Sequence, residues 1–313
     1  MKFINEFNEH DHLDDSYLVI NSVKGTSNTG LQYLSITFQD KTGVIEGKKW
    51  EATDADAEIF QIGNIVRIEG EVLLYRNSLQ IKVVRGEKID QDNIDVSQFI
   101  LSAPVPQDSL ERSLKKYYES INNQTCKAIL KSILNDVYQD FIKYPAAVRN
   151  HHEYANGLLH HTVSMANMAD LVCSQYTNVD RDMLLTGVIL HDIGKTIELS
   201  GPIIPKYTLE GRLIGHISIM QSMIRETCKK LQIDSSIDET GLLLEHMILS
   251  HHGKYEFGSP VLPLTREALL LNMIDDMDAK MNILDKALGQ IKEGEFTPRL
   301  FPLDDRCFYK PKK

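Results

Sequence analysis

The chain has 313 residues, of which 42% are hydrophobic and 25% charged. This composition excludes a chain disordered throughout and is typical of a globular protein, and the length suggests two domains, or three. Its formal net charge of −10 disfavours a non-specific DNA coat, because proteins of that class are usually basic. The polar, acidic N-terminus does not resemble a signal peptide, and no apolar run approaches the roughly 20 residues that span a bilayer. We therefore expect a soluble, cytoplasmic protein without a membrane partner.

Residues 16–85 contain five short segments rich in Val, Ile, Leu and Tyr, which predict β-strands. Turn signals such as those at 25–28 and 40–43 separate them. Between the third and fourth segments, residues 51–59 are rich in Ala, Asp and Glu and are long enough for one short helix. Five strands with a helix after the third is the layout of an OB-fold barrel, although another small β-barrel would show a similar pattern. We predict an OB-fold nucleic-acid-binding domain in residues 1–90.

The pattern changes after the predicted barrel. Residues 91–107 lack periodicity and finish in Pro-Val-Pro, which indicates a linker. From Asp108 onward the apolar residues recur at helical spacing, and Asp108 itself is a candidate N-cap. We therefore predict a multidomain α+β protein, in which the five-stranded OB-fold barrel is followed by an all-α helical bundle over 108–293. The last residues, 294–313, contain three prolines and a basic end, and we expect a tail that wraps the domain or hangs free.

The helical half contains an ordered series of residues that can bind metal ions. The series is His161, His191, Asp192, Lys195, His216, His251, His252 and Asp275. Histidine and carboxylate side chains are the ligands that divalent transition ions prefer. A lone histidine beside apolar residues is more often a packing residue, but this ordered series, which we expect to lie on helices, predicts a metal site.

The adjacent pair His191-Asp192 is the informative feature of the series. Neighbouring residues on a helix point about 100° apart, so both side chains can flank one point without competing for it. A carboxylate at that point can bridge two cations, which is the two-metal arrangement for phosphoester cleavage. Lys195 lies one turn after His191 and would face the same cavity, where it could hold a phosphate oxygen. We predict Asp192 and Lys195 as catalytic residues.

The segments NGLLHHTVSMA, ILHDIGK, GHISIM, LSHHG and IDDMDAK resemble the HD-domain metallo-phosphohydrolases in order and spacing. The resemblance implies a first ligand set of His161, His191, Asp192 and Asp275, and a second set of Asp192, His216, His251 and His252. It leaves Asp278 as a supporting residue, and it leaves open whether His252 contacts an ion directly. His160 precedes the first ligand, so either His160 or His161 could face the metal; we favour His161. The neighbouring His151 and His152 could line a substrate channel or only pack.

The whole chain has a narrower resemblance. A barrel followed by this HD domain, with PAAVRNHHEYANGLLHHT before it and FYKP after it, resembles the YhaM family of bacterial 3'-5' exoribonucleases. The resemblance implies a 3'-5' exonuclease that hydrolyses single-stranded RNA, and also single-stranded DNA, by metal-activated water. The cofactor would be two divalent ions, with Mn(II) favoured. Two alternatives stay open: an enzyme that hydrolyses a free nucleotide, in which the barrel serves assembly, and a binding module with a structural metal. The chain could also form a homo-oligomer.

The predicted barrel carries basic and aromatic residues suited to a nucleic acid. OB-folds bind single strands through a basic groove and aromatic stacking platforms. Because side chains alternate between the two faces of a strand, Tyr33 points to the opposite face from Leu34 and Ile36, which favours Tyr33 as an exposed stacking platform. Any one aromatic residue could instead belong to the barrel core. The predicted nucleic-acid-binding residues are Tyr33, Lys48, Lys49, Arg67, Arg76 and Lys82.

Overall fold

The structure is a computed structural model that describes residues 1–27, 29–76, 78–90, 98–101, 103–146, 154–202 and 205–312. The chain divides into two units, Met1–Ser102 and Ala103–Lys313, each with its own hydrophobic core. Much of the predicted linker, and both His151 and His152, lie outside the described residues. Among the helices that are described, none is long and apolar enough to cross a membrane.

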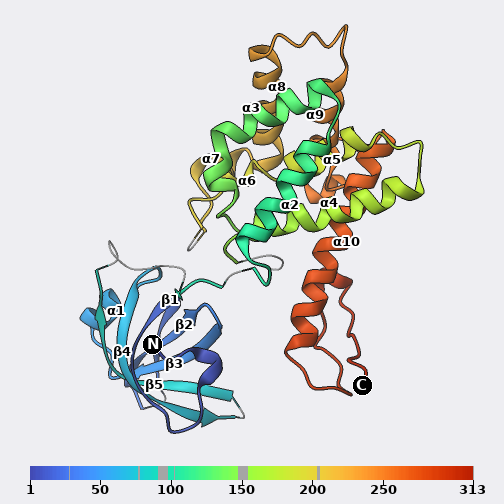
Figure 1. The fold of residues 1–313 in the computed structure, drawn as a ribbon. Helices are drawn as coiled ribbons and strands as arrows, with labels where there is room; N and C mark the ends of the chain where they lie inside the picture. Colours follow the sequence, from blue (N-terminus) through green and yellow to red (C-terminus); the bar gives the residue numbers. More distant parts are fainter. Residues whose placement is uncertain are drawn as a thin grey trace. The chain divides into compact units, whose positions relative to one another are not determined.

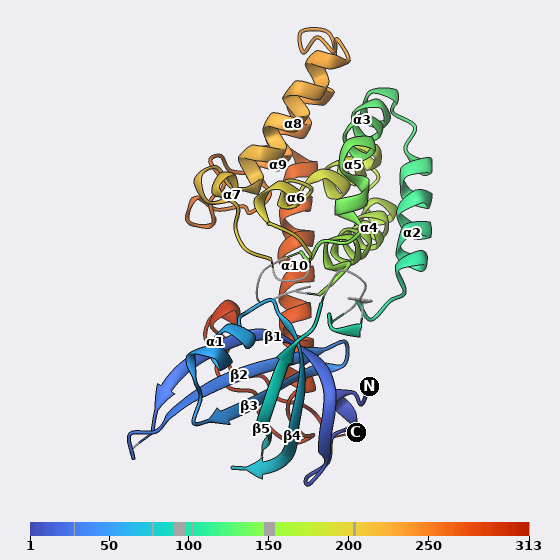
Figure 2. The same ribbon diagram turned by 90° about the vertical axis from the view of Figure 1, so that its left-hand side faces the viewer.

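The first unit is a closed barrel of five strands in the order β1-β2-β3-β5-β4 (Figures 1 and 2). Its elements are η1 (Ile4–Glu6), β1 (His12–Thr26), β2 (Gln32–Asp40), β3 (Gly43–Trp50), α1 (Asp54–Ile59), β4 (Ile65–Tyr75) and β5 (Ser78–Lys88). Neighbouring strands are antiparallel, except that β3 and β5 run parallel. The first half of β1 pairs with β4 and its second half with β2, which closes the sheet. The prediction of an OB-type barrel with a helix after the third strand is confirmed.

The alternation of side chains along β2 shows why this sequence forms a barrel wall. Leu34, Ile36 and Phe38 are buried in the barrel core, whereas the residues between them are partly exposed on the outer face. Tyr33 therefore lies on the outer face, as its position in the alternation predicts. Helix α1 begins where Thr53 accepts a hydrogen bond from the Asp56 N–H, while the Asp56 carboxylate accepts one from the Thr53 N–H.

A short part of the predicted linker packs on the barrel. Phe99 and Ile100 are buried. The Lys41 N–H donates a hydrogen bond to the Gln98 carbonyl, and the Gln39 amide donates to the Phe99 carbonyl. Burial of the apolar Phe99 and Ile100 side chains lowers the free energy of the folded state. Residues 98–101 belong to the first unit.

The regular structure described in the second unit is helical, which confirms the predicted all-α domain. Its elements are α2 (Gln107–Ser120), α3 (Gln124–Phe141), α4 (Gly157–Gln175), α5 (Arg181–Leu190), α6 (Lys195–Glu198), α7 (Leu209–Leu213), α8 (His216–Lys230), α9 (Thr240–Ser250), η3 (Tyr255–Phe257), α10 (Arg266–Gly289) and η4 (Phe301–Leu303). The prediction that Asp108 caps α2 is wrong, because Pro106 occupies the N-cap. Asp108 lies in the first turn, where its negative charge still favours the helix N-terminus.

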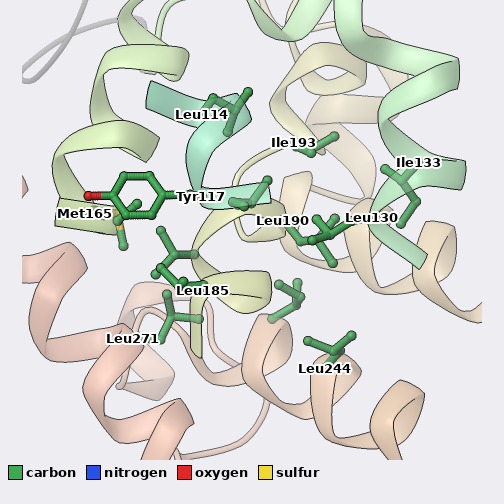
Figure 3. Packing of buried hydrophobic residues seen from close by; sticks show 14 of the residues in the cluster. Leu114, Tyr117, Leu130, Ile133, Met165, Leu185, Leu190, Ile193, Leu244 and Leu271 are labelled. Carbon is green, nitrogen blue, oxygen red and sulfur yellow. The ribbon is translucent and has the colours of Figure 1, made fainter. Parts of the chain in front are cut away.

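Helix α5 is the central element of this unit. All eight residues from Met183 to Leu190 are buried, because the helix is apolar on every side. Helices α3, α4, α9 and α10 pack around it. Figure 3 shows Leu185 and Leu190 among side chains from the neighbouring helices, including Leu244 and Leu271. The C-terminal end of α5, which leads directly into His191 and Asp192, is therefore held firmly in the core.

The C-terminal segment is tied to α10 rather than hanging free. After α10 the chain turns back along that helix (Figure 1), with a β-bridge between Phe296 and Tyr309. The Lys310 ammonium donates hydrogen bonds to the carbonyls of Leu288 and Ile291 at the end of the helix. A cation at this position also interacts favourably with the negative end of the helix dipole.

Candidate metal centre

The predicted ligands converge at the C-terminal end of α5 from four other helices or their ends. His161 lies in α4, His191 and Asp192 follow α5, His216 begins α8, His251 and His252 follow α9, and Asp275 lies in α10. The expectation that all of them lie within helices is wrong for both adjacent pairs, which occupy the turn after a helix. Residue spacing alone does not reveal such turns.

Asp192 stands at the centre of the cluster, and its two carboxylate oxygens face different histidines. Its Oδ2 lies 3.2 Å from His191 Nε2 and 3.8 Å from His161 Nε2. Its Oδ1 lies 3.5 Å from His216 Nε2 and 3.9 Å from His251 Nε2. One carboxylate therefore presents an oxygen to each of two groups of imidazoles.

Every histidine of the cluster has its Nδ1 anchored on an oxygen. The Nδ1 partners are Asp278 Oδ2 for His161 (2.6 Å), Val188 O for His191 (2.8 Å), Glu198 Oε1 for His216 (3.1 Å), Ile248 O for His251 (2.6 Å) and Phe257 O for His252 (2.8 Å). Carboxylates and carbonyls only accept hydrogen bonds, so each Nδ1 is the donor. In the neutral ring this leaves each Nε2 without a proton, which is the state that binds a metal ion.

The donor atoms fit divalent cations. Asp192 Oδ1, His216 Nε2 and His251 Nε2 are buried, and none of the three has a hydrogen-bond partner in the described part of the chain. Leaving buried polar atoms unpaired costs about 1–3 kcal/mol each, and a cation between them would satisfy all three. The ligand atoms of His216, His251 and His252 lie within 4.8 Å of one another, as do those of His161, His191 and Asp192. Nitrogen and oxygen donors without thiolates suit Mn, Fe, Co or Zn.

The electrostatics of the cluster also favour a cation. Burial alone would raise the pKa of Asp192, but Lys195 and His191 hold it well below its usual range. Burial, with a smaller effect from His252, lowers the pKa of His251 well below its ordinary value. Burial would likewise lower the pKa of His161, but hydrogen bonds with Asp275 and Asp278 raise it to about 9. The cluster thus contains a carboxylate anion and neutral His251, and an ion bound at His161 has to displace a proton.

Lys195 reaches the cluster, where its ammonium is paired with Asp192. It is buried, and its Nζ donates a hydrogen bond of 2.6 Å to Asp192 Oδ2. Burial would lower the pKa of Lys195, but the charge of Asp192 raises it. The lysine therefore stays charged and orients the central carboxylate, rather than standing unpaired for a phosphate.

The geometry shows which of two adjacent residues faces the cluster, at positions 160–161 and at positions 275–276. The Nδ1 of His160 contacts the Tyr154 hydroxyl at 2.6 Å, whereas His161 Nε2 lies 3.2 Å from Asp275 Oδ1. Asp276 is exposed and pairs with Lys280. His161 and Asp275 are therefore the residues that face the cluster.

Sequence reasoning missed two residues that support the site. Glu198 is buried and accepts hydrogen bonds from the His216 N–H (3.0 Å) and Nδ1. A Cβ on Gly194 would lie only 2.3 Å from the His216 carbonyl oxygen, so glycine permits the start of α8 to approach Asp192. The available signals were an acidic residue three positions after Lys195 and the glycine inside the HDIGK segment.

Comparison with known proteins now identifies the family. Residues 158–280 match the HD domain family. The chain is 42% identical over 299 residues to "3'-5' exoribonuclease YhaM" of Bacillus subtilis (strain 168), covering 95% of this chain and 94% of that protein. The chain belongs to the YhaM family. Among solved structures, the second OB-fold domain of replication protein A from Methanococcus maripaludis is 23% identical, covering 30% of this chain and 98% of its own, with a TM-score of 0.25.

In this YhaM-family chain, three of the predicted nucleic-acid-binding residues lie near one another on the outer face of the barrel. Lys48 of β3 and Lys82 of β5 are paired in register. Tyr33 packs beside Trp50, with ring centroids 5.2 Å apart, and the Lys48 ammonium lies 4.9 Å from the Tyr33 ring centroid. Trp50 and Tyr75 are 43% and 51% exposed and were not among the predicted residues. The strand alternation that selected Tyr33 also selects Trp50, which is paired with it in register.

A hollow of about 270 Å³ lies on this face, and we call it the aromatic hollow. It is lined by Lys48, Trp50, Leu73, Leu74, Tyr75, Gln80, Ile81 and Lys82. The other predicted residues have different surroundings. Arg67 forms two hydrogen bonds of 2.8 Å with Asp14, which neutralises its charge. Lys49 donates to the Trp50 carbonyl, and the Arg76 guanidinium lies 5.3 Å from the Tyr75 ring centroid.

Proposed function

We propose that this chain is a metal-dependent 3'-5' exoribonuclease that hydrolyses the phosphodiester bonds of single-stranded RNA. The observation that carries the proposal is the position of Asp192, whose two oxygens face two groups of Nδ1-anchored histidines. The direction of degradation and the choice of RNA are supported by the Bacillus subtilis relative. The free-nucleotide alternative is not favoured, because the likeness to that exoribonuclease covers the barrel as well as the HD domain.

We propose the predicted residues as the ligands: His161, His191, Asp192 and Asp275 for one ion, and Asp192, His216, His251 and His252 for the other. Bound divalent ions lower the pKa of water toward neutrality and neutralise charge on the phosphoryl oxygens. Lys195 keeps Asp192 oriented and ionised. The side chains of His161, His191 and His251 are fully buried, whereas those of His216 and Asp275 are 12% and 16% exposed and His252 is half-buried. Substrate therefore enters past His216, His252 and Asp275.

The direct test is the product ladder from a single-stranded RNA labelled at one end. Metal-free protein should be inactive, and Mn(II) should restore activity best among Mn(II), Mg(II) and Zn(II). A 5'-labelled strand should shorten stepwise, and a 3' label should be released at once as a mononucleotide. Internal cleavage, or stepwise shortening of the 3'-labelled strand, would contradict the proposed direction. The same assay on a DNA strand tests the prediction that single-stranded DNA is a second substrate.

We further propose that the aromatic hollow guides the strand. Its exposed Trp50 and Tyr75 rings, with Lys48 and Lys82 beside them, combine stacking faces with positive charge. Trp50 is the one tryptophan of the chain, so its fluorescence reports directly on this surface. Saturating single-stranded RNA should quench it, and Tyr75→Ala should weaken binding by about tenfold, within the range for loss of one stacked base. Unchanged fluorescence under conditions where a gel shift shows full binding would contradict this location.

Because RNA is the substrate, we also propose that the protein is cytoplasmic, which cell fractionation can test.

A further inference from the structure

The edge of the metal centre is formed by the segment that follows His252. The His252 Nδ1 donates a hydrogen bond of 2.8 Å to the backbone carbonyl of Phe257. The imidazole rings of His252 and His216 lie 5.3 Å apart, so this edge borders the partly exposed side of the cluster. Phe257 is thus attached directly to the side from which a substrate has access.

The Phe257 ring is available to a ligand. It is 58% exposed, and the Lys254 ammonium lies 5.2 Å from its centroid. A single exposed phenylalanine is common on protein surfaces and says little by itself. Here the exposed ring stands beside a lysine cation, and the backbone carbonyl of the same residue contacts a candidate metal ligand. An aromatic face next to a positive charge is the combination that binds one nucleotide, the ring through its base and the cation through its phosphate.

The backbone that carries the ring is held in a tight turn. The N–H groups of Phe257 and Ser259 donate to the Lys254 carbonyl at 3.2 Å, and the Gly258 N–H donates to the Tyr255 carbonyl at 3.0 Å. Gly258 has a φ of +92°, a conformation that suits glycine. Because the turn is already ordered, a ligand that stacks on Phe257 pays little conformational entropy.

We propose that Phe257 stacks on a nucleobase that flanks the scissile phosphate, and that Lys254 binds a backbone phosphate beside it. The inference rests on the proposed hydrolysis of RNA at the metal centre. Stacking uses the face that every base has, so this site would hold the strand end without selecting a base. Phe257 and Lys254 belong to the second unit, whereas the aromatic hollow belongs to the first.

The test pairs a protein substitution with a substrate lacking one base. Hydrolysis rates are measured for the full-length Mn(II) enzyme and for Phe257→Ala on a single-stranded RNA. The same strand is then used without the base of its last or its penultimate nucleotide. Phe257→Ala should lower kcat/KM on intact RNA by about tenfold. On the strand that lacks the stacked base, wild type should lose a similar factor, and the variant should lose nothing further.

Three further variants and a metal titration distinguish loss of stacking from damage to the metal site. Phe257→Trp should restore activity on intact RNA, whereas Phe257→Leu should not, because leucine has no flat face. Phe301→Ala removes a phenylalanine that is 89% exposed in η4 and should leave the rate unchanged. Mn(II) affinity should be unchanged in Phe257→Ala, because the backbone carbonyl, not the ring, holds His252.

The outcomes distinguish this inference from the proposed function. Equal losses for Phe257→Ala on intact and base-free strands would overturn the stacking role, as would an unchanged rate on intact RNA. A wild-type enzyme that hydrolyses none of the strands would instead overturn the proposed function, and the stacking role with it.

Discussion

Asp278→Asn is the substitution that best isolates how the chain prepares a metal ligand. Asp278 is buried in α10, and its Oδ2 accepts the hydrogen bond from His161 Nδ1 at 2.6 Å. Its Oδ1 accepts a hydrogen bond from the Ser164 hydroxyl. Asparagine has almost the same shape: its amide oxygen can accept from His161, and its NH₂ can donate to Ser164. The substitution therefore removes the negative charge while keeping both contacts.

The expected loss follows from the type of hydrogen bond. A bond to a charged group contributes about 1.5–3 kcal/mol and a neutral one about 0.5–1.5 kcal/mol, a difference of about 1–1.5 kcal/mol. That difference corresponds to about tenfold weaker metal binding at the site that contains His161. Asp278→Ala removes the acceptor that both the His161 N–H and the Ser164 hydroxyl use, so we expect about a hundredfold loss, the upper end for partners of metal-binding histidines.

The assay is a calorimetric titration of metal-free protein with Mn(II) alone. Asp276→Asn is the matched control, since it removes the same charge from an exposed side chain of the same helix. The control should bind as wild type does. Asp278→Asn within twofold of wild type would refute the reasoning, and an equal loss in both variants would show that net charge, rather than the contact with His161, sets the affinity.

Four further predictions concern Asp192, Gly194, the barrel and the structure of the substrate. Asp192→Asn should abolish hydrolysis and leave the Kd for RNA largely unchanged; turnover within about tenfold of wild type, about 1.4 kcal/mol, would contradict its central role. Gly194→Ala places a Cβ 2.3 Å from the His216 carbonyl and should weaken Mn(II) binding at the His216 side, whereas Gly289→Ala, with open space around its Cβ, should not. Removal of residues 1–102 should impair degradation of long RNA much more than hydrolysis of a small activated phosphodiester. It should also reduce the salt dependence of RNA binding. Equal degradation of long RNA by both proteins at the same salt would argue against the barrel as a guide for the strand. A hairpin with a 3' single-stranded tail should be trimmed to a few nucleotides before the stem, because melting each pair costs free energy; smooth digestion through a GC-rich stem without ATP would contradict this.

Local patterns in the sequence were sufficient for the architecture and for the candidate ligands. Alternation along a strand depends only on neighbouring residues, so Leu34 and Ile36 predict the barrel core and Tyr33 the outer face, as the structure has them. The residue types at His191, Asp192 and the other cluster positions carry coordination chemistry in themselves, and their order resembles a known family. The choice of Asp275 over its neighbour also follows from that resemblance, and the structure places Asp275 in the cluster.

Only the tertiary structure decided which contacts support or neutralise the functional residues. The partner of Arg67 is Asp14, 53 positions earlier, and the pairing depends on the register of two strands. The resemblance marks Asp278 as a supporting residue, but only the structure shows that it accepts the hydrogen bond of the His161 Nδ1, 117 positions away on another helix. Gly194 matters because the backbone of His216 passes close to it. Contacts of this kind arise when separate elements pack together, and no periodicity within one element encodes them.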